Sequence, residues 1–265
     1  MVIGLDKFRE HFAGEEDKYI IIGGTACDVN LRDTNTEPRD TVDIDIILIF
    51  ENMTADFGRK FWKFIDDGGY HNRSRKRGEG KEPVPELFRF MKPENHGYPQ
   101  QLELLSVHPD ILGEPNGFHL TPIPVSESIP SLSAIIMDKE YYDFTLSRRK
   151  VIDGLSVADF IALLCLKATA FVNLSLQKKE DPNSVQGHDI RKHRDDVFKL
   201  LSAIENTDTI MLPENIKTKV EAFTSQIEES CEDKDFLKSM DKTLGIGRDA
   251  ILEYMEQLRD VLKIN

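Results

Sequence analysis

The segment TVDIDIIL, Thr41 to Leu48, sets two aspartates into a run of β-branched and apolar residues. Valine and isoleucine favour a buried β-strand, in which residues two apart share one face. Asp43 and Asp45 therefore point to the same side of this strand, where two carboxylates repel each other and lose hydration on burial. A divalent cation removes both costs, because Mg²⁺ binds hard oxygen ligands. The alternative is an edge strand with both aspartates in water, and the short motif alone favours that interpretation.

The segment before this strand gives the two aspartates a context. KYIII, Lys18 to Ile22, predicts a strand that ends at two glycines, and TACDVNLR after them predicts one or two helical turns. Backbone N–H groups in such a turn approach a phosphate closely, and the helix N-terminus adds positive potential. Gly23, Gly24 and the hydroxyl of Thr25 are therefore a candidate phosphate-binding turn. Taken alone, the two glycines are better explained as an ordinary strand-to-helix turn.

A third carboxylate stands in a similar setting. In QLELLSV, Gln101 to Val107, Glu103 alternates with leucines and lies on one face of an expected strand. If that strand neighbours the one with Asp43 and Asp45, Glu103 completes a metal-binding triad. An outward-facing glutamate is an equally good interpretation.

The composition indicates a globular protein. The chain has 265 residues, of which 40% are hydrophobic and 31% charged. A net charge of −13 argues against a surface that binds nucleic acid as a whole, but leaves room for a local basic site. Three separate cysteines without a CxxC pair indicate free thiols in a reducing cytoplasm. The N-terminus lacks the apolar core of a signal peptide, and no apolar run approaches the ~20 residues of a membrane helix. We therefore expect a cytoplasmic protein with no membrane partner.

The two halves of the chain differ in their hydrophobic patterns. Short apolar runs between turn residues predict a mixed α+β sheet domain over residues 1–150. From Ser156 onward the patterns are helical, so residues 151–265 are expected to form a helical domain. Its first helix is expected to begin at the capping sequence SVAD and to run to about Gln177. The other helices are expected at Asp56–Asp66, His188–Ile204, Glu214–Glu229 and Arg248–Leu262, and further strands at Leu87–Met91, Ser133–Met137 and Tyr141–Thr145.

These motifs together resemble a known family. GGTA at residues 23–26, followed by RDTVDID at residues 39–45, is similar to the GGTA…R-x-T-x-DID signature of nucleotidyltransferase-fold proteins, and most similar to the abortive-infection (AbiEii-like) toxin nucleotidyltransferases. The likeness continues in LLCLKATAF, which contains Lys167, and in RKHRDDVFKLL, which contains Asp196. The chain departs from the family at Lys192-His193, where the family often has Lys-Asp. The resemblance covers residues 19–201 in patches.

The resemblance implies a chemistry and a set of roles. A nucleotidyl group would pass from a nucleoside triphosphate to an acceptor hydroxyl on RNA, tRNA or protein, with pyrophosphate leaving. Three carboxylates would bind Mg²⁺, or Mn²⁺ in its place, and the glycine turn would bind the phosphates. Lys167 would neutralise the charge on the leaving pyrophosphate, and Asp196 would orient the Lys167 side chain. The metal ligands would be Asp43, Asp45 and Glu103, and the phosphate-binding residues Gly23, Gly24, Thr25, Lys167 and Asp196. The protein would then be the toxin of a toxin–antitoxin or phage-defence pair, with an antitoxin protein as partner.

Two other functions stay open at this point. One is a nucleotide-binding or partner-binding protein without turnover, and the other is a nucleotidyltransferase that modifies a small, antibiotic-type molecule. The basic stretch HNRSRKRGEGK, His71 to Lys81, bears on the acceptor. It is either a local nucleic-acid contact or, as such stretches more often are, a solvated linker.

Overall fold

The computed structural model describes residues 2–72, 86–106, 135, 138–204 and 210–264. The chain divides into two compact units. Unit 1 comprises Met1–Asn30 and Arg39–Asp159, and unit 2 comprises Leu31–Pro38 and Phe160–Asn265. Strands lie in unit 1 and long helices fill unit 2, which confirms the α+β class expected from the sequence.

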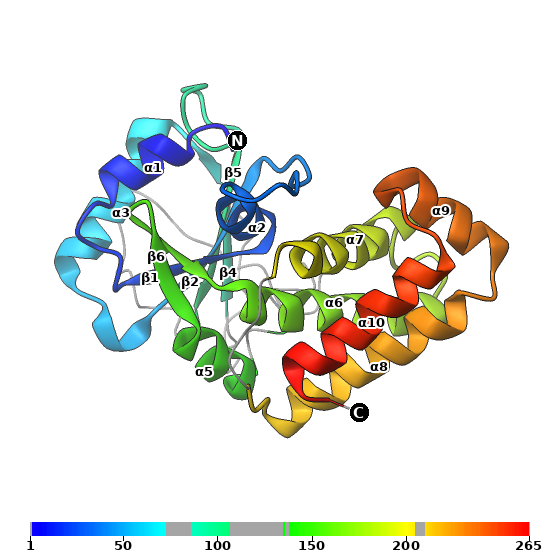
Figure 1. Ribbon diagram of the computed structural model, residues 1–265. Helices are drawn as coiled ribbons and strands as arrows, with labels where there is room; N and C mark the ends of the chain where they lie inside the picture. The colour runs from blue at the N-terminus through cyan, green and yellow to red at the C-terminus, as the bar shows by residue number, and fades with distance from the viewer. Residues whose placement is uncertain (1, 73–85, 107–134, 136–137, 205–209, 265) are drawn as a thin grey trace. The chain divides into compact units, whose positions relative to one another are not determined.

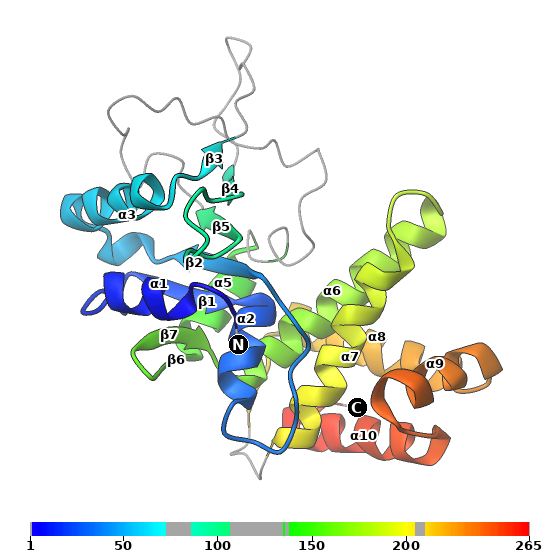
Figure 2. The ribbon, with the colours of Figure 1, turned by 90° about the horizontal axis from the view of Figure 1, so that it is seen from above.

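The described part of unit 1 is built on a mixed sheet of seven strands (Figure 1). Their order is β3-β4-β5-β2-β1-β7-β6 (Figure 2). The central strand β2 runs antiparallel to β1 on one side and parallel to β5 on the other. β1 is also parallel to β7, and the outer pairs β3–β4, β4–β5 and β6–β7 are antiparallel. The strands are β1 (Tyr19–Ile22), β2 (Asp43–Leu48), β3 (His71–Asn72), β4 (Glu86–Met91), β5 (Gln101–Ser106), β6 (Arg149–Ile152) and β7 (Leu155–Ala158).

Two helices cover one face of this sheet, α1 (Leu5–His11) and α3 (Ala55–Gly68) (Figure 2). The ring of Phe8 in α1 lies 5.4 Å from that of Tyr19 in β1 and 5.8 Å from that of Phe64 in α3. Phe61 of α3 lies 5.8 Å from Phe90 of β4. Aromatic rings packed at these distances supply the main apolar layer on this face. The remaining described helices of unit 1 are α2 (Gly23–Leu31), the short 3₁₀ helix η1 (Phe50–Asn52) and α5 (Lys139–Ser147).

The strand register separates the apolar face from the face with the carboxylates. Ile22 of β1 pairs with Asp45 of β2, and Asp45 pairs in turn with Glu103 of β5. Side chains alternate along a strand and paired residues share a face. Tyr19 therefore lies on the face that α1 and α3 cover, whereas Asp43, Asp45 and Glu103 lie on the opposite face.

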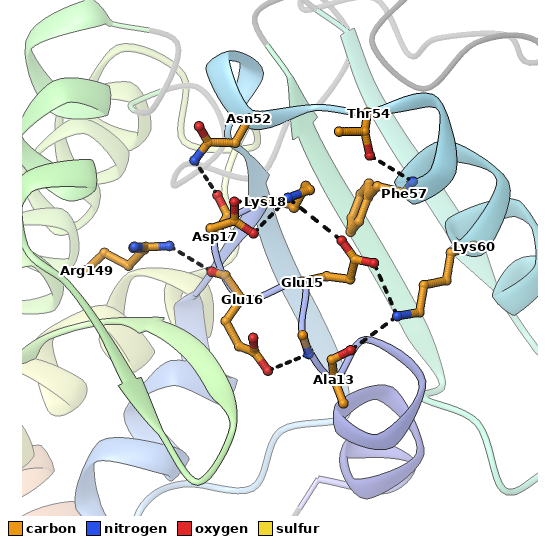
Figure 3. A network of polar contacts seen from close by, with 11 residues as sticks. Ala13, Glu15, Glu16, Asp17, Lys18, Asn52, Thr54, Phe57, Lys60 and Arg149 are labelled. Carbon is orange, nitrogen blue, oxygen red and sulfur yellow. Dashed lines mark hydrogen bonds and ion pairs between the residues drawn. The ribbon is translucent and has the colours of Figure 1, made fainter.

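The connection from α1 to β1 is fixed by polar contacts with neighbouring segments (Figure 3). Arg149 of β6 donates a hydrogen bond to the backbone oxygen of Glu16 at 2.8 Å. Asn52 of η1 donates to the backbone oxygen of Asp17 at 2.7 Å. These two hydrogen bonds hold the segment just before β1 against residues of β6 and η1.

Unit 2 is a bundle of five described helices together with Leu31–Pro38. Within it α6 packs against α7 and α8, and α10 packs against the same two helices. Most of these helices agree with the expected ranges, but α9 was not expected, because its sequence is polar and only Met240 is buried. The helices are α6 (Phe160–Glu180), α7 (Gly187–Ala203), α8 (Glu214–Ser230), α9 (Lys234–Leu244) and α10 (Arg248–Leu262).

Two expectations from the sequence are wrong. Residues 141–145 were expected to form a strand, but they lie in α5, whose first turn is capped by the carboxylate of Asp138. Residues 156–158 were expected to open a helix, but they belong to β7, all four residues of which are buried. The long helix begins at Phe160 instead, and unit 1 extends to Asp159. Of the strand expected at Ser133–Met137, only Ile135 is among the described residues.

Among the described residues, one helix, α6, is long and apolar enough to cross a membrane, but 67% of its apolar window is buried inside the protein. The core helix of a soluble protein has the same length and composition. This burial is compatible with a soluble protein.

Candidate active site

The candidate site in unit 1 gathers three segments that are distant in sequence: β2, β5 and the start of α2. The register between β2 and β5 places Asp45 opposite Glu103 and Asp43 opposite Gln101. The Thr25 hydroxyl at the start of α2 donates a hydrogen bond to the backbone oxygen of Asp43 at 2.5 Å. The structure thus brings Thr25, Asp43, Asp45 and Glu103 together at one end of the sheet.

The two glycines allow the strand and the helix to approach closely. Gly23 has a φ of +71°, and a Cβ at this position would overlap with the carboxylate of Asp45. A Cβ at Gly24 would lie 2.7 Å from Nη2 of Arg39 and 2.9 Å from Oγ1 of Thr41. The sequence suggested that these glycines make room for a phosphate. Their contacts bring Asp45 of β2, and Arg39 and Thr41 of the segment before it, close to the start of α2, and a phosphate at this turn stays a prediction.

Glu103 is buried, with 2% of its surface exposed, and its two oxygens have different surroundings. Oε1 accepts hydrogen bonds from Nε of Arg89 at 2.6 Å and from Nε2 of Gln101 at 2.7 Å. Oε2 is buried and has no hydrogen-bond partner among the described residues. Burial and then the charge of Asp45 raise the pKa of Glu103 to about 7, against the lowering effect of Arg89. Glu103 is therefore able to gain or lose a proton near neutral pH.

The chemistry of these residues fits a hard divalent cation. Carboxylate oxygens are the ligands that Mg²⁺ and Mn²⁺ prefer. The buried Oε2 of Glu103 and the repulsion between Glu103 and Asp45 are both features that a bound cation would relieve. In their present positions, however, no three His, Cys, Asp or Glu side chains of the described ranges surround a common point as metal ligands.

The remaining two predicted site residues form a buried ion pair within unit 2. Lys167 in α6 is 0% exposed, and its Nζ lies 2.5 Å from Oδ2 of Asp196 in α7, which is 2% exposed. A buried ammonium among apolar neighbours needs an anion. Asp196 is such an anion, and the pair links the two helices at the centre of the bundle.

Arg89 and Gln101 were not predicted as site residues. Gln101 stands two residues before Glu103 in the same strand, so alternation alone places both on one face. Arg89 is the only charged residue within LFRFM, and its position opposite Glu103 follows from the pairing of β4 with β5, which the sequence does not reveal. Of the basic stretch His71–Lys81, the residues after Asn72 lie outside the described ranges.

Compared with known proteins, the chain matches no protein-family model, no curated protein and no solved structure. Its function therefore has to be argued from the site.

Proposed function

We propose that the protein is a Mg²⁺-dependent nucleotidyltransferase that moves a nucleotidyl group from a nucleoside triphosphate to an acceptor hydroxyl, with pyrophosphate leaving. The observation that supports this most strongly is the pairing of Asp45 with Glu103 beside the N-terminus of α2, which Gly23 holds against Asp45. Carboxylates attract a metal ion and a helix N-terminus attracts phosphate. A metal–triphosphate complex needs both in one place. We also propose that the sheet of unit 1 is a nucleotidyltransferase-like sheet.

Each residue of the site has a role in this reaction. Asp43, Asp45 and Glu103 would hold the ion, and bound Mg²⁺, or Mn²⁺ in its place, would supply Lewis-acid stabilisation of the phosphoryl oxygens. The first N–H groups of α2 have no partner within the helix and would receive phosphate oxygens. Glu103 would also be the group that helps to accept the proton of the attacking hydroxyl.

In unit 2 the residues concerned are Lys167 and Asp196, which form an ion pair. Asp196 pairs with the buried Lys167, whose Nζ lies 2.5 Å from Oδ2 of Asp196. A role for Lys167 at the triphosphate stays a prediction from the family resemblance.

For the acceptor we propose RNA, including tRNA, or a protein, and for the biological context a cytoplasmic toxin that is controlled by an antitoxin partner. The decisive experiment supplies each ribonucleoside triphosphate with Mg²⁺ and measures pyrophosphate release by the full-length protein. Transfer of the labelled nucleotidyl group to RNA, to protein or to small hydroxyl compounds then identifies the acceptor. The matched control is Asp43→Asn combined with Asp45→Asn.

Release by the parent protein but not by the control variant would support the proposal. Nucleotide binding without pyrophosphate release under any of these conditions would contradict turnover and favour a nucleotide-binding protein instead. Transfer to a small hydroxyl compound alone would favour the antibiotic-type alternative.

A further inference from the structure

Arg89 of β4 stands directly opposite Glu103 in the antiparallel pairing of β4 with β5. Its Nε lies 2.6 Å from Oε1 of Glu103. A charge-assisted hydrogen bond of this length is among the stronger polar contacts in a protein. Both residues belong to paired strands of the sheet, so the backbone places the two side chains next to each other on one face.

Gln101 donates to the same oxygen. Its Nε2 lies 2.7 Å from Oε1, so that this one atom receives two hydrogen bonds while Oε2 receives none from the described residues. Two donors on one oxygen fix the plane of a carboxylate, and burial of the side chain leaves it little room to rotate. The direction of Oε2 is therefore determined by the contacts of Oε1.

We propose that Arg89 is a positioning residue which, together with Gln101, holds Oε1 of Glu103 and so presents Oε2 as the oxygen that serves the metal ion and the acceptor hydroxyl. This inference rests on the proposed function, in which Glu103 is a metal ligand. Arg89 acts through Glu103 and does not contact the substrate. Residues that orient a metal ligand in this way commonly change metal affinity or activity by 10–100-fold when they are removed.

The test compares Arg89→Met with Arg89→Lys and with Glu103→Gln. Arg89→Met should lower kcat by roughly 10–100-fold and leave the KM for the triphosphate nearly unchanged. Arg89→Lys should recover part of this loss, because lysine supplies one charged donor to Oε1. Introduced into Glu103→Gln, the methionine substitution should add almost no further loss, because the residue through which Arg89 acts is already altered.

A second measurement does not depend on turnover. Calorimetric titration with Mn²⁺ alone should show a roughly 10–100-fold weaker affinity for Arg89→Met than for the parent protein. The matched control is Arg148→Met, which removes another arginine–carboxylate pair of unit 1: Nη2 of Arg148 lies 2.6 Å from Oδ2 of Asp159. This control should retain the Mn²⁺ affinity and the kcat of the parent.

The two hypotheses fail in different ways. If the parent protein releases no pyrophosphate but Mn²⁺ affinity still falls in Arg89→Met, the proposed function fails and the positioning role stands. If Arg89→Met raises KM at an unchanged kcat, Arg89 binds substrate directly and the inference is wrong. The inference is also wrong if Arg89→Met lowers kcat by the same factor in Glu103→Gln as in the parent protein. Should Arg89→Met not fold, Gln101→Leu removes the other donor to Oε1 and is expected to shift Mn²⁺ affinity and kcat in the same direction. Unchanged values in that variant would overturn the inference.

Discussion

The carboxylate of Asp45 lies directly against the Cα of Gly23, so that no side chain fits between the first residue of α2 and the centre of β2. The φ of +71° at Gly23 is also one that residues with a Cβ rarely adopt. Steric and conformational demands therefore coincide at this position. Gly23 sets the distance between the helix N-terminus and the carboxylates.

Gly23→Ala is expected to lower activity by roughly 100-fold, because displacement of a catalytic group by about 1 Å has effects of that size. The control is Gly14→Ala, where φ is +83° but no atom lies within 4 Å of the added Cβ. Left-handed backbone costs an alanine about 1–2 kcal/mol in both variants. Thermal unfolding and pyrophosphate release should show a larger loss at Gly23. Equal losses in the two variants would mean that the contact with Asp45 is unimportant.

Replacing Asp43 and Asp45 together with asparagine should remove Mg²⁺-dependent activity without lowering the melting temperature of the metal-free protein. Removal of the charge at Asp45 also relieves its repulsion with Glu103. Addition of Mg²⁺ should raise the melting temperature of the parent only, since a ligand stabilises the state that binds it. A large loss of stability in the metal-free variant would instead assign the aspartates a structural role.

Local patterns in the sequence were sufficient to predict β2 and the shared face of its aspartates, because alternation is a property of a single strand. They left the partner of β2 open, because pairing in a mixed sheet joins distant segments. An outward-facing Glu103 was therefore as plausible as a Glu103 beside Asp45. The same limit explains SVAD: its local signature is that of a helix start, but pairing of Val157 with Ile21 makes it a strand. Arg89 was missed because its partner is defined by sheet register alone.

Glu103 should make stability fall as the pH rises, which is the opposite of a carboxylate whose pKa is lowered by folding. Its pKa of about 7 in the folded protein exceeds the ordinary value of 4.5, so the folded state binds the proton more tightly than the unfolded state. The contribution to stability is complete below about pH 4.5 and is lost as the pH rises to about 7. The difference amounts to on the order of 3 kcal/mol at about 1.4 kcal/mol per pH unit.

Denaturant unfolding of the metal-free parent and of Glu103→Gln across pH 5 to 8 measures this contribution. The glutamine variant should gain stability relative to the parent as the pH rises, because it carries no charge beside Asp45. Parallel curves for the two proteins would show that the carboxylate of Glu103 ionises as readily in the folded state as in the unfolded state.

Lys167→Met should destabilise the protein by about 3–5 kcal/mol, because it leaves Asp196 buried without this ammonium. Combining it with Asp196→Leu should restore most of the stability. Lys238→Met is the control, since its pair with Asp235 is 77% and 90% exposed and is worth at most about 1 kcal/mol. If the double variant is no more stable than Lys167→Met, the two residues do not act as a pair.

The restored double variant also allows a fair test of triphosphate binding. If Lys167 meets the β- and γ-phosphates, calorimetry should show a much larger loss of affinity for a triphosphate than for a monophosphate. Equal losses for the two ligands would place Lys167 away from the phosphate tail.

The acceptor can be tested at the basic stretch His71–Lys81, the densest basic segment in a chain of net charge −13. Neutralising Arg73, Arg75, Lys76 and Arg77 together should weaken RNA binding and flatten its dependence on salt, because each lost phosphate contact removes a released counterion. Affinity for the nucleoside triphosphate should hardly change, since none of the residues proposed to bind it lies in this stretch. A variant that binds RNA like the parent at every salt concentration would show that the stretch is only a linker. RNA would then lose its best supported contact, and a protein or small-molecule acceptor would become the better proposal.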